Sequence, residues 1–280
     1  MKRFLSASFA VLCTVILLGV ASCKKDKDTN TTDQYPIPSN LQKIATGYAT
    51  GAGVKVEAYA AGDLYVGYNK LYIALYDSAT GNRLTSANVT ITSVMTMMGN
   101  MASNGPAESP ASQTAEEGLF NGVAVYTMPS GANCSWALNI HVVNAANSNA
   151  GDFSQTVSIM QPTLSTEYSI IANDDSSSLV VAMVGPTDPK FGTNNFELAI
   201  YRKQGMMGYV PDDSYTVDIT PTMPSMGGMS SPNNVNPVSM GNGHYKGSVN
   251  FNMSGDWRIM VHLMHNGNMA DTAHYFDLYF

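Results

Sequence analysis

Charged residues are scarce in this 280-residue sequence, and their scarcity narrows the functions it can have. Only 12% of the residues are charged, with 14 Lys and Arg against 21 Asp and Glu. Affinity for nucleic acid comes from clustered Lys and Arg, so we expect no nucleic-acid partner. Long helical periodicity is also missing. The 24 glycines and 13 prolines are typical of short strands joined by turns.

Cysteine is nearly absent too, with 3 residues in the whole chain. Cys13 and Cys23 lie in an N-terminal segment that has its own explanation, which leaves Cys134 without a partner. We therefore expect no intrachain disulfide. A lone thiol in an oxidising compartment is best kept buried.

The N-terminal residues 1–22 have the features of a lipoprotein signal peptide. Lys2 and Arg3 form a basic region, and the apolar run after them is shorter than the roughly 20 residues of a spanning helix. The sequence Val20-Ala21-Ser22-Cys23 resembles a bacterial lipobox, which implies cleavage before Cys23 and acylation of its thiol. An ordinary signal peptide cut nearby is the alternative.

Lipid on Cys23 makes the membrane a partner and the bacterial cell envelope the expected location. Lys24 after this cysteine resembles lipoproteins that are sent onward to an outer membrane. Without Lys2 and Arg3, 12 basic residues face 21 acidic ones, a net charge of −9. Residues 23–45 are polar and carry little apolar surface, so we expect a flexible tether there.

Beyond the tether the sequence repeats itself, which predicts two copies of one domain. Leu71–Tyr76 aligns with Phe196–Tyr201, and Gly122–Met128 aligns with Gly247–Met253. Each copy contains about six strand-like runs separated by turn residues. We therefore predict an all-β protein with two tandem immunoglobulin-like antiparallel β-sandwiches, at 46–168 and 169–280.

Alternation of apolar and polar residues assigns the faces of the strands. In the second copy Trp257, Ile259, Val261 and Leu263 share the core phase. In the first copy that phase holds Cys134, Trp136, Leu138, Ile140 and Val142. Met128 and Met253 are predicted to lie in the cores as well.

Two methionine motifs follow corresponding strands and are the candidate functional site. Methionines stand at spacing i, i+3, i+6, with glycine after the middle one, at Met95, Met98 and Met101 and again at Met223, Met226 and Met229. Thioether sulfur is a soft, neutral ligand that suits Cu(I). Both motifs lead into polar segments, so each is predicted to be a loop that can gather three sulfurs around one ion.

Two alternatives to metal binding remain open for these motifs. The methionines plug the ends of the sandwiches, or they form an adaptable surface for a partner. Additional ligand candidates are Met97, Met240 with His244, and the Met206-Met207 pair. A further soft patch is conceivable at His262, Met264 and His265.

Enzymatic motifs are missing from the sequence. It has no Gly-x-Ser-x-Gly elbow and no His-Glu-x-x-His helix, and Cys134 has the core phase rather than a base beside it. Asp174-Asp175 and Asp212-Asp213 lack the further oxygen ligands of a calcium loop, so we interpret them as solvated turns. We expect a protein that is not an enzyme.

The order of strand, methionine run, polar loop and strand resembles the YtkA-like and FixH-like domains. The segment from Tyr245 through Gly247 and Met253 to Gly255-Asp256-Trp257 carries most of the resemblance, and Leu119 to Trp136 is similar. The resemblance implies an immunoglobulin-like fold outside the cytoplasm, often near copper handling. Family members often have a histidine after the methionine run, whereas this chain has Ala102 and Ser230, which leaves binding of Cu(I) by thioethers alone.

The sequence as a whole predicts an acylated envelope protein with two methionine loops that bind Cu(I) for sequestration or transfer, with copper as its cofactor. The alternative is a structural or adhesive surface module that binds a protein or glycan. A third hypothesis is an accessory subunit of a larger envelope complex.

Overall fold

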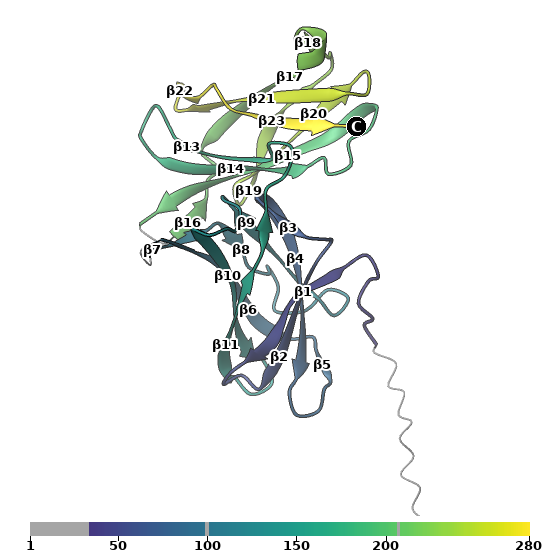
Figure 1. The fold of residues 1–280 in the computed structure, drawn as a ribbon, viewed down its shortest axis with the longest axis vertical. Coiled ribbons are helices and arrows are strands. Elements are labelled where there is room, and N and C mark those ends of the chain that lie inside the picture. Colours follow the sequence, from purple (N-terminus) through teal and green to yellow (C-terminus); the bar gives the residue numbers. More distant parts are fainter. Residues whose placement is uncertain (1–33, 99–100, 206–207) are drawn as a thin grey trace, which may run out of the picture. The chain divides into compact units, whose positions relative to one another are not determined.

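The structure, a computed structural model, describes residues 34–98, 101–205 and 208–280, and these residues form β-strands joined by turns (Figure 1). The predicted signal peptide, Cys23, and the Met206-Met207 pair lie outside the described residues. In the part that the structure describes, no helix has the length and apolarity needed to cross a membrane.

The first sandwich consists of two antiparallel sheets and a small parallel pair. One sheet has the order β1-β2-β4-β9-β8, with β5 beside β4; the other is β11-β10-β6-β7, and β12 pairs with β3. The strands are β1 (Gln42–Ala49), β2 (Val54–Ala60), β3 (Leu64–Tyr65), β4 (Gly67–Asp77), β5 (Arg83–Leu84), β6 (Ala87–Met97), β7 (Met101–Gly105), β8 (Ala107–Glu108), β9 (Phe120–Tyr126), β10 (Cys134–Asn144), β11 (Ala150–Val157) and β12 (Ile159–Met160).

The second sandwich has the sheet β13-β14-β15-β20-β19, with β16 beside β15, and the sheet β18-β17-β21-β22, with β23 beside β21. Its elements are β13 (Glu167–Ile171), β14 (Ser178–Gly185), β15 (Gly192–Gln204), β16 (Gly208–Pro211), β17 (Tyr215–Met223), the 3-10 turn η1 (Pro224–Met226), β18 (Met229–Ser230), β19 (Val235–Gly241), β20 (His244–Phe251), β21 (Asp256–His265), β22 (Asn268–Asp271) and β23 (Tyr275–Tyr279).

The main sheets of the two sandwiches share one strand order. β1, β2, β4, β9 and β8 of the first correspond to β13, β14, β15, β20 and β19 of the second. Successive strands that pair in antiparallel sheets and pack face to face form an immunoglobulin-like β-sandwich, as the sequence predicts. The common order agrees with the predicted duplication, which stays a prediction.

Each sandwich encloses its own core around a buried tryptophan. β10 alternates between buried and more accessible residues throughout, and β21 does so as far as Met264, which confirms the predicted core phase on both strands. The indole nitrogen of Trp136 donates to the carbonyl of Met128, and that of Trp257 donates to the carbonyl of Met253. The Met128 side chain itself is exposed, so its predicted place in the core is wrong; its backbone, not its thioether, makes the tryptophan contact.

A third apolar cluster joins the sandwiches. It contains Val123 and Val125 of β9, Val180 and Ala182 of β14, and Ala199 and Tyr201 of β15. Because the opposite faces of these strands line the cores, each strand has a run of four or five consecutive buried residues.

The first sandwich begins earlier than the predicted end of the tether. β1 starts at Gln42, and Lys43 on this strand pairs with the buried carboxylate of Glu57 on β2. The ion pair and the strand ladder order residues whose polar composition alone suggested a flexible segment.

Candidate functional site

The first methionine motif lies on a β-hairpin and not in an open loop. β6 continues through Met97, and β7 begins at Met101. Met95 is 7% exposed and lies opposite Trp136 on β10, within the core. Met98 and Met101 are 66% and 62% exposed. The motif therefore contributes its first sulfur to the core and the other two to the surface.

The second motif divides in the same way. Met223 ends β17 and lies in the core of the second sandwich, while Met226 in η1 and Met229 on β18 are exposed. The Asp256 carboxylate accepts hydrogen bonds from the backbone and hydroxyl groups of Ser225, which fixes the turn that carries Met226. Gly227 has φ of 67°, a backbone conformation that favours glycine.

The two motifs therefore do not each gather three equivalent sulfurs. β6 and β17 are longer than the sequence predicts and include Met95 and Met223. Both residues are at strand positions that face inward, where an unbranched apolar side chain packs into the core. For these two residues the alternative of plugging the sandwich describes the structure better than a ligand role at the surface.

The strand register produces a different grouping of sulfur in the first sandwich. Met97 lies opposite Cys134 of β10 on one side and opposite Met101 of β7 on the other. Directly opposed residues of antiparallel strands have Cβ atoms about 4.5–5.5 Å apart and side chains on one face. Cys134, Met97 and Met101 thus form a row of one thiol and two thioethers across three neighbouring strands, which we call the sulfur row.

The sulfur row leads from the core to the surface. Cys134 is buried, Met97 is half-buried and packs against the core, and Met101 is exposed. Burial raises the pKa of the Cys134 thiol, so the free protein holds it in the protonated form. The sequence indicated a core position for Cys134 but not its neighbours, because strand pairing over this separation leaves no local pattern.

Both ring nitrogens of His244 contact carboxylates. Its Nδ1 lies 2.7 Å from Oε1 of Glu197, and its Nε2 lies 3.0 Å from Oε1 of Glu108. Met240 is exposed on the edge strand β19. Both ring nitrogens of His244 therefore have acidic partners in this structure, and the Met240 and His244 ligand pair stays a prediction.

The same contacts link the sandwiches, because Glu108 belongs to the first and His244 to the second. The hydroxyl of Tyr201 also donates to Glu108. The hydrogen bond with Glu108, followed by that with Glu197, raises the pKa of His244. Burial acts to raise the pKa of Glu108, but its bonds with His244 and Tyr201 outweigh burial and lower it. The two carboxylate contacts therefore favour the protonated, charged form of the imidazole.

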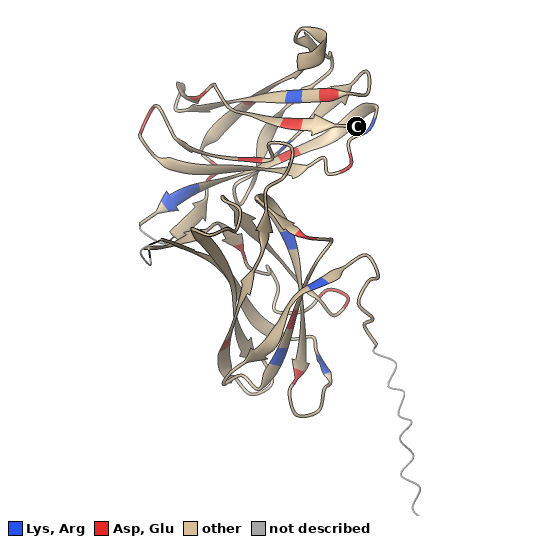
Figure 2. Ribbon diagram, viewed as in Figure 1, with Lys and Arg blue, Asp and Glu red and all other residues tan. Residues whose placement is uncertain are grey.

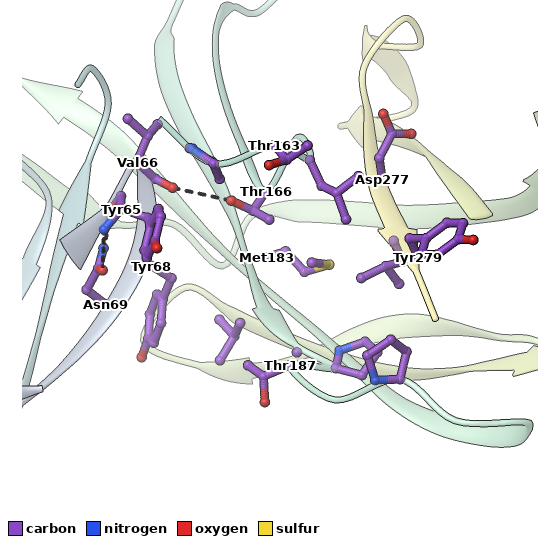
Figure 3. Close-up of a pocket in the computed structure, with 17 residues that line it drawn as sticks. Tyr65, Val66, Tyr68, Asn69, Thr163, Thr166, Met183, Thr187, Asp277 and Tyr279 are labelled. Atoms are coloured by element: carbon purple, nitrogen blue, oxygen red, sulfur yellow. Dashed lines mark hydrogen bonds between the residues drawn. The ribbon is translucent and has the colours of Figure 1, made fainter. Parts of the chain in front are cut away.

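A cleft of about 440 Å³ lies beside this contact (Figure 3). Tyr65 and Tyr68 line it from the first sandwich, and Met183, Pro186 and Tyr279 line it from the second. The hydroxyl of Thr166, in the segment between the sandwiches, donates to the carbonyl of Val66 across one wall. Tyr65 and Tyr279 are exposed, which gives the cleft an aromatic rim.

In the part of the chain that the structure describes, charged residues are spread over many strands. Figure 2 shows Lys and Arg on separate strands of both sandwiches, with Asp and Glu between them. The predicted patch of His262, Met264 and His265 also separates, because His265 turns to the carboxylate of Asp174.

Comparison with known proteins adds a family to this geometry. A family model described as YtkA-like matches residues 173–262. Residues 173–262, which make up most of the second sandwich, are therefore similar to YtkA-like domains. The match contains Met223, Met226 and Met229 as well as His244, so the family resemblance of the second copy is confirmed. No curated protein matches the chain.

The solved structures that are similar to this chain are distant in sequence. Invasin, a bacterial integrin-binding protein, is 13% identical with a TM-score of 0.22 and covers 86% of this chain, which spans only 38% of the invasin chain. A conserved domain protein from Bacillus anthracis is 13% identical with a TM-score of 0.29, over 90% of this chain and 93% of its own. Domains 5-6 of the S-layer protein SbsC are 14% identical with a TM-score of 0.26, over 85% and 97%.

Proposed function

We propose that this YtkA-like protein is a lipid-anchored envelope protein that binds Cu(I) through the sulfur row. The observation that carries the proposal is the register that aligns Cys134, Met97 and Met101 on one face of three strands. The ligand set differs from the three thioethers predicted from sequence spacing. It keeps Met97 and Met101, adds Cys134 and leaves Met95 in the core.

The chemistry of the donors favours Cu(I) over harder ions. Thiolate and thioether ligands select Cu(I), while Mg²⁺ and Ca²⁺ prefer oxygen. One thiolate with two neutral thioethers balances the single charge of Cu(I), which suits a half-buried position. Because burial raises the pKa of Cys134, binding of the ion must release a proton.

The second sandwich offers a weaker site of the same kind. Met226 and Met229 are exposed near the η1 turn, but Gly255 stands two residues before Trp257, where Cys134 stands before Trp136. Without a thiolate, the two thioethers provide neutral ligands only. We therefore expect one tight site and one weak site in the chain.

Anaerobic titration of the mature protein with Cu(I), against a competing chromophore, tests the proposal. We expect Cys134→Ser to weaken the tight site at least tenfold, and Met97→Leu and Met101→Leu to weaken it by smaller factors. Met269→Leu is the matched control, since this exposed methionine lies on β22 of the other sandwich. Release of one proton per tightly bound ion, measured in two buffers, is the second readout.

Tight binding that is unchanged by Cys134→Ser, or no Cu(I) binding by the unmodified protein, would refute the copper proposal. Near-ultraviolet circular dichroism of each variant shows whether the sandwich around Trp136 is intact. A lost site in an intact variant then reports ligation and not unfolding.

The lipid anchor has its own test. Cys23→Ala is expected to move the protein from the membrane fraction to the soluble envelope fraction, while Cys13→Ala leaves it anchored. Continued anchoring of the Cys23→Ala protein would contradict acylation at this position.

The cleft supports a second candidate function, which is binding of a protein or glycan partner by a surface module. Exposed aromatic rings with little charge around them, such as Tyr65 and Tyr279, are suited to stacking on a sugar or packing on a peptide. If cross-linked complexes from solubilised membranes disappear with Tyr65→Ala and Tyr279→Ala but persist with Cys134→Ser, the binding module is favoured. A stable multi-subunit complex in that experiment would identify an accessory subunit.

A further inference from the structure

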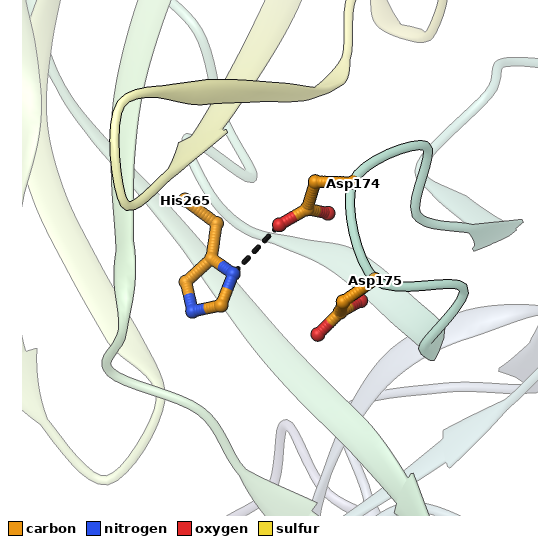
Figure 4. A group of neighbouring side chains, drawn as sticks. All are labelled: Asp174, Asp175 and His265. Carbon is orange, nitrogen blue, oxygen red and sulfur yellow. Dashed lines mark hydrogen bonds and ion pairs between the residues drawn. The ribbon is translucent and has the colours of Figure 1, made fainter.

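Two turns of the second sandwich bring together two carboxylates and an imidazole that are far apart in sequence. Asp174 and Asp175 lie in the turn between β13 and β14, and His265 ends β21 (Figure 4). One ligand atom from each residue lies within 4.8 Å of the others. These side chains have no part in the sulfur row or in the cleft.

Asp174 is not the solvated turn residue that the sequence suggests. Its side chain is 5% exposed, and its Oδ2 lies 2.7 Å from Nδ1 of His265. Its Oδ1 is buried and has no hydrogen-bond partner among the residues that the structure describes. A buried, unpaired carboxylate oxygen is costly, and a bound ion is one of the few groups that satisfy it.

His265 is held in place for a ligand role. Its ring lies 5.3 Å from the ring of Tyr215, and its Nε2 lies 3.2 Å from the side-chain amide of Asn266. An amide can donate or accept by turning over, so Nε2 keeps a partner whether or not it carries a proton. Nδ1 is therefore free to exchange its proton for a metal ion while the outer nitrogen stays bonded.

The surrounding charge matches a divalent cation. Asp174, Asp175 and Asp212 supply three negative charges, and Arg202 bonds to the last two. With neutral His265 the group carries a net charge of −2, from three carboxylates and one guanidinium.

We propose that Asp174, Asp175 and His265 bind a divalent transition-metal ion, with Zn²⁺ as the ion that fits best. Two carboxylate oxygens, one imidazole nitrogen and a water molecule form a tetrahedral set typical of zinc. Ligand distances of about 2.1 Å place tetrahedral donors about 3.4 Å apart. This separation lies between the 2.7 Å of the His265–Asp174 contact and the 4.8 Å within which the three ligand atoms lie, so small side-chain movements are enough to form the site. The ion would tie the β13–β14 turn to the end of β21, a contact independent of the Cu(I) proposal.

The test uses the mature chain with Cys134→Ser, so that the thiol does not compete for Zn²⁺. Isothermal titration with Zn²⁺ after treatment with chelator is expected to show one site per chain, and Zn²⁺ should raise the melting temperature. Asp174→Asn and His265→Gln should each weaken binding at least tenfold and remove the thermal shift. Added Co²⁺ should give the strong visible absorption of a tetrahedral site and lose it in both variants.

His141→Gln is the matched control, because Nδ1 of His141 also lies 2.7 Å from a carboxylate, that of Asp152. Unlike His265, His141 belongs to no group of three potential metal ligands among the described residues. This variant should bind Zn²⁺ like the parent protein. No binding by the parent, or binding that survives both Asp174→Asn and His265→Gln, would overturn the proposal. Equal loss in the control would indicate non-specific binding and would overturn it as well.

Discussion

At the scale of single residues, two glycines show why the motif of β9 and β20 has its form. A Cβ added to Gly122 would lie 2.9 Å from the carbonyl oxygen of Glu108, and one added to Gly247 would lie 2.3 Å from that of Val235. These carbonyls belong to β8 and β19, the matching edge strands. The motif glycines therefore let an edge strand approach closely, a packing role that carries no copper chemistry.

Gly247→Ala is expected to destabilise the second sandwich by about 1–3 kcal/mol, because the new methyl group collides with the backbone of β19. Denaturation with urea, followed by tryptophan fluorescence, measures the change. Gly131→Ala is the control, since a Cβ there meets nothing within 4 Å. Equal midpoints for the two variants would contradict this explanation of the glycine.

The surroundings of Asp174 and His244 could not be predicted from the residues next to them in the sequence. Asp174 stands in a run of turn residues, and only the approach of His265 from 91 positions away makes it a buried group. His244 follows a Gly-Asn-Gly turn and looks solvated, yet Glu108 reaches it from the other sandwich. Long-range partners decide the environment of both side chains.

At the scale of secondary-structure elements, strand phase was predictable and strand ends were not. The alternation in β10 and β21 identified the core faces, because burial of one face imposes a period of two. Methionine suits a strand end and a loop equally well, so composition did not show that β6 extends through Met97. The register with β10 then decided which sulfurs lie together.

The division of each methionine motif into core and surface predicts unequal costs of truncation. Met95→Ala and Met223→Ala should each lower the free energy of unfolding by about 2–5 kcal/mol, because each leaves a cavity in the core of its sandwich. Met98→Ala and Met226→Ala should change it by less than about 0.5 kcal/mol, as expected of exposed positions. Thermal and urea unfolding of the four variants provide the comparison.

If Met95→Ala and Met98→Ala had equal effects, the assignment of Met95 to the core would be contradicted. The same variants separate packing from ligation. Loss of Met95 should lower the free energy of unfolding and leave the affinity for Cu(I) unaltered, whereas loss of Met101 should lower the affinity for Cu(I) and leave the free energy of unfolding nearly unaltered.

At the scale of the whole molecule, the two sandwiches meet through an apolar cluster and a charged contact beside it. The apolar cluster of β9, β14 and β15 is insensitive to pH. The contact of Glu108, His244 and Glu197 is not, and Lys246 also bonds to Glu197. The stabilisation that the sandwiches gain from contacting each other should therefore depend on pH, whereas the stability of each hydrophobic core should not.

The direction follows from the two shifted groups. The pKa of His244 is raised above its ordinary 6.5, so its stabilisation is fully present below about pH 6.5 and is lost as pH rises through the raised value. The pKa of Glu108 is lowered from 4.5, so its contribution is present above about pH 4.5 and is lost as pH falls through the lowered value. Between these limits both ion pairs are intact.

Urea unfolding of the full chain should accordingly have a higher midpoint near pH 6 than near pH 8.5, and His244→Gln should remove most of that difference. Gln keeps hydrogen-bonding groups but has no charge to lose, so its midpoint near pH 6 should fall toward the value of the parent at high pH. His141→Gln, at an exposed pair within the first sandwich, should retain the pH dependence. The fluorescence of Trp136 and of Trp257, each measured in a variant that keeps only that tryptophan, would show whether the unfolding of both sandwiches depends on pH. A contact shared by the two sandwiches must stabilise each of them. A pH dependence confined to one sandwich would place the titrating group elsewhere.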